Sequence, residues 1–143
     1  MDIRDKNVLV FGSGISGIAA SRLLLREGAD VILYDGNEKL DAETIKENIL
    51  HDEEHGVTLS GDVKVILGEL SKEVMESLVL TVMSPGVPTD LEVVNQMREM
   101  GIPIWGEIEL AYVYGKGEVL AITGTNGKTT TTALVGSILR EYY

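Results

Sequence analysis

The sequence has 143 residues, the length of one ordinary domain, and 44% of them are hydrophobic, which is enough for a packed core. Its formal net charge is −11, from 23 acidic and 12 basic residues, which argues against nucleic acid as a partner because nucleic-acid-binding domains are usually basic. The sequence has no cysteine, so disulfides and cysteine-based zinc or nucleophile chemistry are excluded, and we expect a cytoplasmic protein.

Beyond a polar start at 1–6, which predicts neither a signal peptide nor membrane insertion, strand and helix patterns alternate along the chain. The continuous apolar run at 8–11 is typical of a parallel strand covered on both faces. A helix carrying Leu23 and Leu24 follows, and Gly28 is placed to end it. The same reasoning predicts further strands at 31–34, 63–67, 78–83, 102–104 and 119–122, and further helices at 39–56, after Ser71, at 90–100, 106–113 and 128–140. This alternation predicts an α/β fold with a Rossmann-like, doubly wound parallel sheet.

The first glycine loop, Gly12-Ser13-Gly14-Ile15-Ser16-Gly17, follows a predicted strand and opens a predicted helix, which is the context that the G-x-G-x-x-G motif requires. Its glycines permit a tight turn and let a phosphate approach the backbone. The helix N-terminus offers free N–H groups and partial positive charge to a diphosphate. Asp35 ends the second strand, where an acid can reach a ribose hydroxyl. Alone, the motif favours a dinucleotide such as NAD, and the alternative is a glycine turn chosen only for helix–sheet packing.

A second glycine loop, Gly124-Thr125-Asn126-Gly127-Lys128-Thr129-Thr130, lies between the strand predicted at 119–122 and the last helix. Its composition is typical of a P-loop, in which backbone N–H groups hold phosphate oxygens, Lys128 neutralises their charge and a threonine hydroxyl binds Mg²⁺. Its spacing is shorter than usual, because Ile122 stands where the first glycine would be. A turn with a surface lysine is the alternative. A dehydrogenase has no use for this loop, whereas an enzyme that binds a UDP-linked substrate and ATP needs both loops.

The segment 115–117, Gly-Lys-Gly, is expected to be a linker. Residues 1–117 would then form one domain, and residues 118–143 would be the first βα unit of a P-loop ATPase domain. One βα unit cannot bury both of its faces, so we expect the rest of that domain to be missing. We expect the helix of this unit to fold back, mispack, form an intermolecular contact or be poorly ordered, because its apolar side chains are left exposed. These side chains belong to Ala133, Leu134, Ile138 and Leu139.

The run Thr123-Gly-Thr-Asn-Gly-Lys-Thr-Thr130 is similar to the ATP-loop signature of the Mur ligase family. Asn126 favours the D-glutamate-adding branch over the alanine-adding branch, which typically has histidine at this place. The first glycine loop, Asp35 and the segments 84–88 and 106–111 also occur in the order seen in the D-glutamate-adding branch. The resemblance covers the whole chain, but only the first part of the family's three-domain architecture.

The resemblance implies that residues 1 to about 117 hold the UDP moiety of UDP-N-acetylmuramoyl-L-alanine. The implied UDP-binding residues are Gly12, Gly14, Ile15, Ser16, Gly17, Asp35, Ser84, Pro85 and Gly86. The implied ATP-binding residues are Gly124, Thr125, Asn126, Gly127, Lys128, Thr129 and Thr130. Of these, Lys128 and Thr129 would be catalytic, and Thr129 would bind Mg²⁺. In the family, ATP phosphorylates the substrate carboxylate, and the amine of D-glutamate then attacks the acyl phosphate in a step of peptidoglycan synthesis. The full-length enzyme is expected to be a monomer, and this chain to be inactive alone.

Gly36 and Asn37 stand where related enzymes often carry a Thr-Arg pair, so the grip on uracil is expected to differ here. Three hypotheses for function remain open. The first is an ATP-dependent amide ligase. The second is an NAD-dependent oxidoreductase built on the first loop, and the third is a non-catalytic UDP-binding module. Another Mur ligase specificity also remains open, because the domain that selects the amino acid lies outside this sequence.

Several other residues have structural interpretations that we prefer to functional ones. Glu107 and Glu109 are interpreted as acids in the first turn of a helix rather than as a catalytic pair. His51 and His55 are interpreted as part of a solvated helix rather than a metal site. Trp105 is interpreted as a packing residue. Ser84-Pro85-Gly86, without the resemblance, would be a turn that ends a strand.

Overall fold

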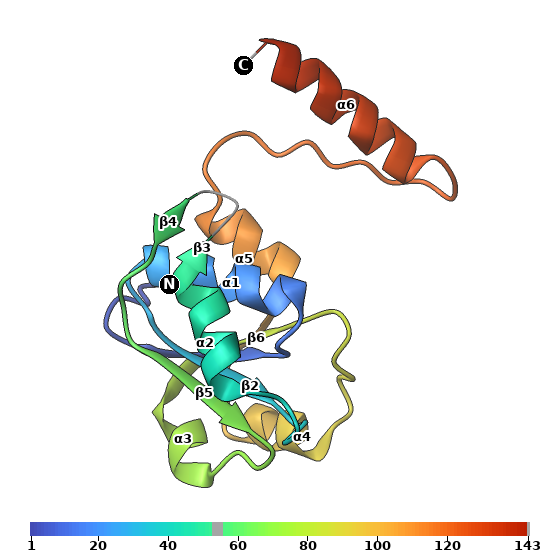
Figure 1. Ribbon diagram of the computed structural model, residues 1–143. Helices are drawn as coiled ribbons and strands as arrows, with labels where there is room; N and C mark the ends of the chain where they lie inside the picture. The colour runs from blue at the N-terminus through green and yellow to red at the C-terminus, as the bar shows by residue number, and fades with distance from the viewer. Residues whose placement is uncertain (53–55, 143) are drawn as a thin grey trace.

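The computed structural model describes residues 1–52 and 56–142 and contains a five-stranded parallel sheet with helices on both faces (Figure 1). The strands lie in the order β5-β2-β1-β6-β7, and every neighbouring pair runs parallel. They are β1 (Asn7–Phe11), β2 (Asp30–Asp35), β5 (Val63–Leu67), β6 (Leu78–Met83) and β7 (Ile104–Gly106). The chain adds strands on one side of β1 and then crosses to the other, so the strand order reverses between β1 and β6. The predicted Rossmann-like, doubly wound sheet is confirmed.

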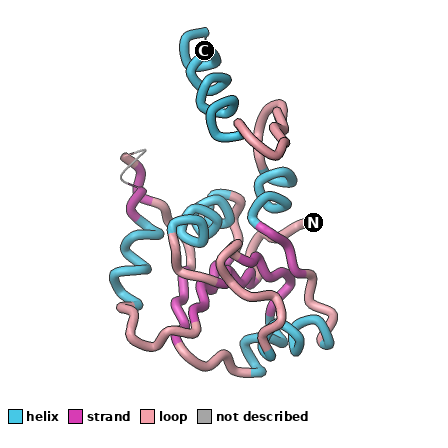
Figure 2. The backbone as a smooth tube through the Cα atoms, turned by 90° about the vertical axis from the view of Figure 1, so that its right-hand side faces the viewer, coloured by secondary structure: helices cyan, strands magenta, loops and turns pink. Residues whose placement is uncertain are grey.

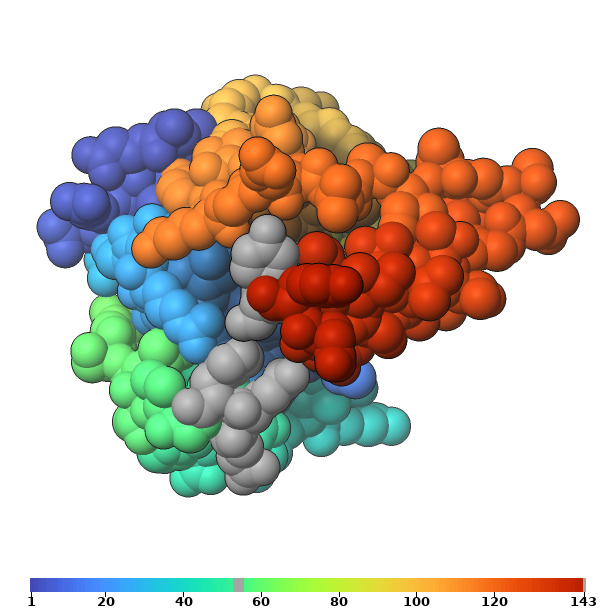
Figure 3. All heavy atoms as spheres, turned by 90° about the horizontal axis from the view of Figure 1, so that it is seen from above, coloured from blue at the N-terminus to red at the C-terminus, as the bar shows by residue number. Residues whose placement is uncertain are grey.

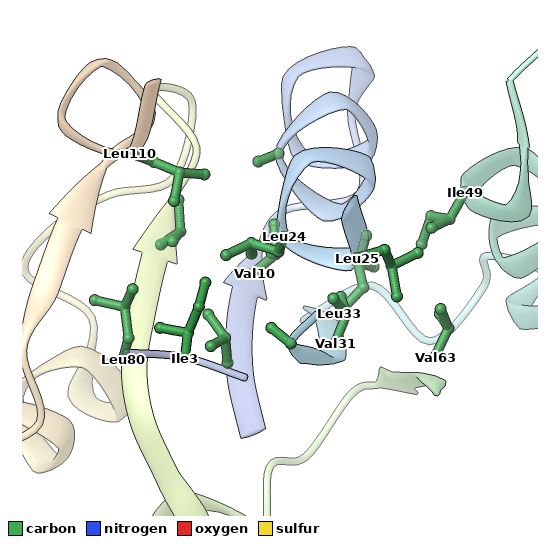
Figure 4. Packing of buried hydrophobic residues seen from close by; sticks show 14 of the residues in the cluster. Ile3, Val10, Leu24, Leu25, Val31, Leu33, Ile49, Val63, Leu80 and Leu110 are labelled. Carbon is green, nitrogen blue, oxygen red and sulfur yellow. The ribbon is translucent and has the colours of Figure 1, made fainter. Parts of the chain in front are cut away.

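The helices divide between the two faces of the sheet, and each face has its own hydrophobic core. One face is covered by α1 (Ile15–Arg26), α2 (Ala42–Leu50) and α5 (Glu107–Tyr114), and the other by α3 (Lys72–Ser77) and α4 (Glu92–Glu99). Within β1, Val8 and Val10 belong to the first core, whereas Leu9 and Phe11 belong to the second. Figure 4 shows Val10 beside Leu24 of α1 in the first core. This alternation explains the unbroken apolar run of β1, since both of its faces are buried.

The helix predicted at 39–56 is shorter than expected, and the prediction is wrong beyond Leu50. Helix α2 is capped by Asp41 and gives way to an antiparallel pair, β3 (His51–Asp52) and β4 (Val57–Thr58). The extended chain at His51 lets Asp52 turn back on α1, where its buried carboxylate meets two arginines. A tertiary ion pair therefore ends the helical run. His51 lies in a strand rather than a helix, and His55 lies outside the described residues.

The strand predicted at 119–122 does not form, although the helix predicted after it does. Val119 and Leu120 are 66% and 67% exposed, and no strand lies beside them in the described part of the chain. A strand needs a neighbour to pair its backbone N–H and C=O groups, so an unpaired apolar run stays irregular. Of the predicted βα unit, only the helix α6 (Lys128–Tyr142) is present.

Helix α6 stands apart from the sheet (Figures 1 and 2). None of its described residues is buried, and Leu134 and Ile138 are 60% and 50% exposed. Seen from above in Figure 3, the orange and red C-terminal segment extends past the rest of the molecule. Among the described residues, no helix has both the length and the apolar character that crossing a bilayer demands.

Candidate functional site

The first glycine loop follows β1 and carries the chain directly into α1. Gly12 has a φ of +109°, a region that disfavours other residues, and its N–H donates to the carbonyl of Tyr34 at 2.8 Å. A Cβ atom at Gly17 would overlap the carbonyl oxygen of Gly12, so only glycine lets α1 start this close to the strand. At Gly14, by contrast, a Cβ atom would meet nothing within 4 Å. The loop thus has two glycines that the fold requires and one that faces open space.

The N-terminus of α1 is open to a ligand. Its N-cap residue is Gly14, so no side chain caps the helix, and its first turn contains no acid. The first intrahelical bond runs from Ile18 N to Gly14 O, which leaves the N–H groups of Ile15, Ser16 and Gly17 without helical acceptors. Ile15 is 92% exposed. Uncapped N–H groups at the positive end of a helix favour an anionic ligand.

Asp35 ends β2, and its carboxylate is bound by the same loop. Oδ2 accepts from Ser13 N at 3.0 Å and from Ser13 Oγ at 2.7 Å, and Oδ1 accepts from Asn37 N at 3.0 Å. Burial raises the pKa of Asp35, but the bonds from Ser13 and Asn37 together outweigh it, and the pKa lies below its ordinary value. Asp35 is therefore charged at neutral pH. Because Oδ2 already accepts two bonds, this carboxylate is poorly suited to receive both hydroxyls of a ribose.

Removing the Ser13 hydroxyl is expected to raise the pKa of Asp35 towards its ordinary value. The lowered pKa stabilises the fold at pH values above the unfolded-state pKa of about 3.9, and this stabilisation is lost as the pH falls through the folded-state pKa. Wild type should therefore exceed Ser13→Ala in stability at neutral pH, and the difference should vanish in acid. A carboxyl ¹³C NMR titration measures the pKa, with the exposed Ser60→Ala as control. An unchanged Asp35 titration in Ser13→Ala would contradict this account.

The loop after β6 lies against the first glycine loop. Ser84 N donates to the carbonyl of Phe11 at 3.0 Å, and Val87 N donates to the carbonyl of Ser84 at 3.0 Å, which closes a turn. The Ser84 Oγ atom lies 3.2 Å from the point where a Cβ atom would stand at either Gly12 or Gly17. The structure thus brings two predicted segments together at the carboxyl edge of the sheet, where the strand order reverses. Open α/β sheets bind ligands in such crevices.

Two cavities flank the loop that contains Ser84. One, of about 650 Å³, includes Asp35 and Gly86 and is lined by Phe11, Tyr34, Asp35, Gly36, Asn37, Gly86, Val87, Pro88, Leu91, Glu92 and Val93. The other, of about 500 Å³, lies beside β7 and α5 and is lined by Met83, Ser84, Pro85, Val87, Thr89, Arg98, Ile104, Trp105, Gly106, Glu107 and Ile108. Both have the size of small-ligand pockets. Sequence analysis missed Phe11, Tyr34 and Val87 as lining residues, because apolar side chains at strand ends give no signal that separates lining from core.

Glu107 is a further site residue that sequence reasoning missed. Its position in the first turn of a helix does not reveal its hydrogen-bond partner. The Ser84 hydroxyl donates to Glu107 Oε1 at 2.7 Å. Glu109, two residues on, is exposed and bonds to no other side chain in the described part of the chain, as a first-turn helix acid would. Trp105 packs against the core and against Tyr114, with 6.5 Å between ring centroids, and it also lines the smaller cavity, so its interpretation as a packing residue alone stays a prediction.

The second glycine loop precedes α6 and is shaped by two glycines with positive φ, +151° at Gly124 and +78° at Gly127. Lys128 is the first residue of the helix, and its Nζ atom reaches back across the loop to the carbonyl oxygen of Gly124 at 2.6 Å. The first turn of α6 contains no acid. Thr129 and Thr130 are exposed. Residues 124–130 line neither of the cavities beside Ser84, so the two loops are separate features of this structure.

Groups of three or more histidine, aspartate or glutamate side chains that could hold a metal ion do not occur among the described residues. Asn37 Oδ1 accepts a hydrogen bond from Lys39 N at 3.1 Å, and Asn37 lines the larger cavity together with Gly36.

Comparison with known proteins points to one family. Residues 6–106 match the family model described as "Mur ligase MurD-like, N-terminal domain". UDP-N-acetylmuramoylalanine–D-glutamate ligases from Lachnospira eligens and Lachnoclostridium phytofermentans are 51% and 50% identical over 144 and 143 residues. These matches cover 99% and 100% of this chain, which spans about 30% of the length of either relative.

Solved structures of Mur-type ligases share the fold. A pseudomurein peptide ligase type C from Methanothermus fervidus is 25% identical, with a TM-score of 0.58 over 95% of this chain and 26% of its own. A murein peptide ligase from Psychrobacter arcticus has a TM-score of 0.61 over 94% of this chain and 26% of its own, at 19% identity, which shows the fold alone. The family match over residues 6–106 establishes that the chain belongs to the MurD-like family of Mur ligases, whose N-terminal domain it carries.

Proposed function

We propose that this chain is the UDP-binding part of an ATP-dependent ligase that adds D-glutamate to UDP-N-acetylmuramoyl-L-alanine in peptidoglycan synthesis. The observation that carries the proposal is the uncapped N-terminus of α1, which starts at the carboxyl edge of the sheet, where the loop after β6 lies against the glycine loop; we call this edge the crevice. Its free N–H groups suit a diphosphate. The names of the relatives that match the whole chain supply the substrate and the amino acid.

We assign the diphosphate to the N–H groups at Gly14, Ile15, Ser16 and Gly17, and the uridine to the larger cavity. In this arrangement Asp35 Oδ1 and the Asn37 amide face the base or the ribose, since both residues line that cavity. Gly12, Ser84, Pro85 and Gly86 are assigned to the same site: Gly86 lines the larger cavity, Ser84 and Pro85 line the neighbouring one, and Gly12 lies against Ser84. Because Oδ2 of Asp35 is already taken by Ser13, a UDP compound suits this site better than NAD, whose adenosine ribose typically relies on such a carboxylate.

We further propose that residues 118–143 begin the ATP-binding domain of a cytoplasmic, monomeric enzyme, with residues 1–117 as the UDP-binding domain. The loop of residues 124–130 fits a phosphate, because α6 starts without a first-turn acid and Lys128 lies over the loop. Lys128 would neutralise phosphate charge, and the Thr129 hydroxyl is suited to Mg²⁺. ATP would supply the phosphoryl group that activates the substrate carboxylate for attack by the amine of D-glutamate. We expect no turnover from this chain alone, because it spans only about 30% of the length of the ligases that it matches.

Isothermal titration should show that the chain binds UDP and UDP-N-acetylmuramoyl-L-alanine, at least about tenfold more tightly than NADH, with weak or no binding of ATP. Ile15→Asp should weaken UDP binding, because it puts a carboxylate on an exposed first-turn residue beside the diphosphate. Ile138→Asp makes the same change on α6, where the side chain is 50% exposed, and should leave UDP binding unchanged. Tight NADH binding with no response to UDP would replace this proposal with an oxidoreductase.

A further inference from the structure

Glu107 is joined to the crevice by a hydrogen bond that commits the only hydroxyl proton of Ser84. The Oγ–Oε1 distance is 2.7 Å, and an ionised carboxylate can only accept, so Ser84 must donate. Glu107 is the first residue of α5, which is anchored by Leu110, a core side chain with 1% exposure. The acceptor is therefore held by a helix that packs on the sheet, and a half-buried, charge-assisted bond of this length is well placed to fix the Ser84 rotamer.

Ser84 in turn lies directly against the glycine loop. Its Oγ atom is 3.2 Å from the Cβ positions that Gly12 and Gly17 leave empty, and its backbone N–H holds the end of β1 through Phe11 O. A different Ser84 rotamer would move the Oγ atom at the point where the loop after β6 meets the glycine loop. The chain of contacts runs from α5 through Glu107 and Ser84 to the two glycines that the start of α1 requires.

We propose that Glu107 is a positioning residue for the ligand crevice, acting through Ser84. The proposal rests on the proposed function. With its proton donated to Glu107, Ser84 Oγ turns only lone pairs towards the crevice and accepts from a ligand donor, such as a sugar hydroxyl or an amide N–H. Phosphate oxygens are themselves acceptors, so they bind instead to the N–H groups at the N-terminus of α1. Glu107 thereby separates a position for a ligand donor from the position for the diphosphate.

A double-mutant cycle on the affinity for UDP-N-acetylmuramoyl-L-alanine tests this. Glu107→Ala and Ser84→Ala should each weaken binding, and the double variant should bind no worse than Ser84→Ala alone. We expect a non-additivity of about tenfold, equal to about 1.4 kcal/mol. Glu107→Gln should retain most of the affinity, because its amide oxygen still accepts the Ser84 hydroxyl. In the absence of ligand, the amide NMR signals of Gly12 and Gly17 should shift in Glu107→Ala.

Glu109→Ala is the matched control, because it removes a first-turn acid from the same helix without touching Ser84. It should leave affinity and the two glycine signals unchanged, and a thermal melt of each variant shows that the fold is intact. Additive effects of Glu107 and Ser84, or equal losses in Glu107→Ala and Glu109→Ala, would overturn the inference while leaving the proposed function intact. A wild-type chain that binds neither UDP nor the UDP-sugar would overturn both.

Discussion

Replacing Gly17 by alanine is expected to lower the free energy of unfolding by about 3 kcal/mol and the melting temperature by about 10 °C. The added methyl group would overlap the carbonyl oxygen of Gly12, which is backbone at the end of a central strand and cannot rotate away. Helix α1 would have to shift outward, carrying its free N–H groups away from the crevice. We therefore also expect UDP binding to weaken by about a hundredfold, or about 2.8 kcal/mol. Chemical denaturation and titration calorimetry measure the two effects.

Gly14→Ala makes the same change three residues earlier in the chain. It distinguishes an effect on the stability of the fold from an effect on UDP binding. Gly14 has a φ of −70°, which alanine adopts freely, and its Cβ atom would meet nothing within 4 Å. Its stability should be unchanged or slightly higher, because alanine restricts the unfolded chain. UDP binding should still fall, since the methyl group would stand in the open space before α1. A Gly14→Ala variant that binds UDP normally would show that the diphosphate does not approach the loop there.

The glycine loop and the parallel sheet were predictable because they follow from short-range patterns. The apolar run 8–11 had to be buried on both faces, and the glycine spacing of 12–17 fits a tight turn between a strand and a helix. The reversal of strand order then places the ends of β1 and β6 side by side. Local patterns do not predict that order; Gly12 and Ser84, which lie 72 positions apart in the sequence, were expected in one UDP site because of the resemblance to the Mur ligases.

The features that sequence reasoning missed all depend on a distant partner. The helix predicted at 39–56 ends early because Asp52 forms ion pairs with arginines of α1, and no local sequence pattern predicts that pairing. The strand predicted at 119–122 has the right composition but no neighbouring strand in the described chain. Glu107 has the sequence context of a helix acid, and its bond to Ser84 exists only because β6 and α5 meet in the fold. Local chemistry predicted which elements form, whereas pairing across the fold decided where they end.

Removing the Asp52 carboxylate is expected to produce the largest loss of stability outside the binding site. Its Oδ1 and Oδ2 accept from Arg22 at 3.1 Å and from Arg26 at 2.6 Å, and its side chain is only 2% exposed. Arg22 also donates to the carbonyls of Asn48 and His51 at the end of α2. Asp52 thus joins α1 to the C-terminal end of α2. Asp52→Ala leaves two cations facing one another without their anion, which is costly when such pairs are buried.

We expect Asp52→Ala to lower the free energy of unfolding by about 3 kcal/mol, near the lower end of the range for breaking a buried ion pair. The side chains of Arg22 and Arg26 are 20% and 42% exposed, so water can partly solvate their charges once the carboxylate is gone. Asp62→Ala removes an equal charge from an exposed side chain and should change the urea midpoint little. UDP affinity should survive in the folded fraction, because Arg22 lies about two helical turns along α1 from Ile15, the first residue of the helix. This separates Asp52→Ala from Gly17→Ala, which should lose stability and affinity together. If Asp52→Ala and Asp62→Ala unfold at the same urea concentration, the ion pairs do not hold α2 in place, and the early end of that helix has another cause.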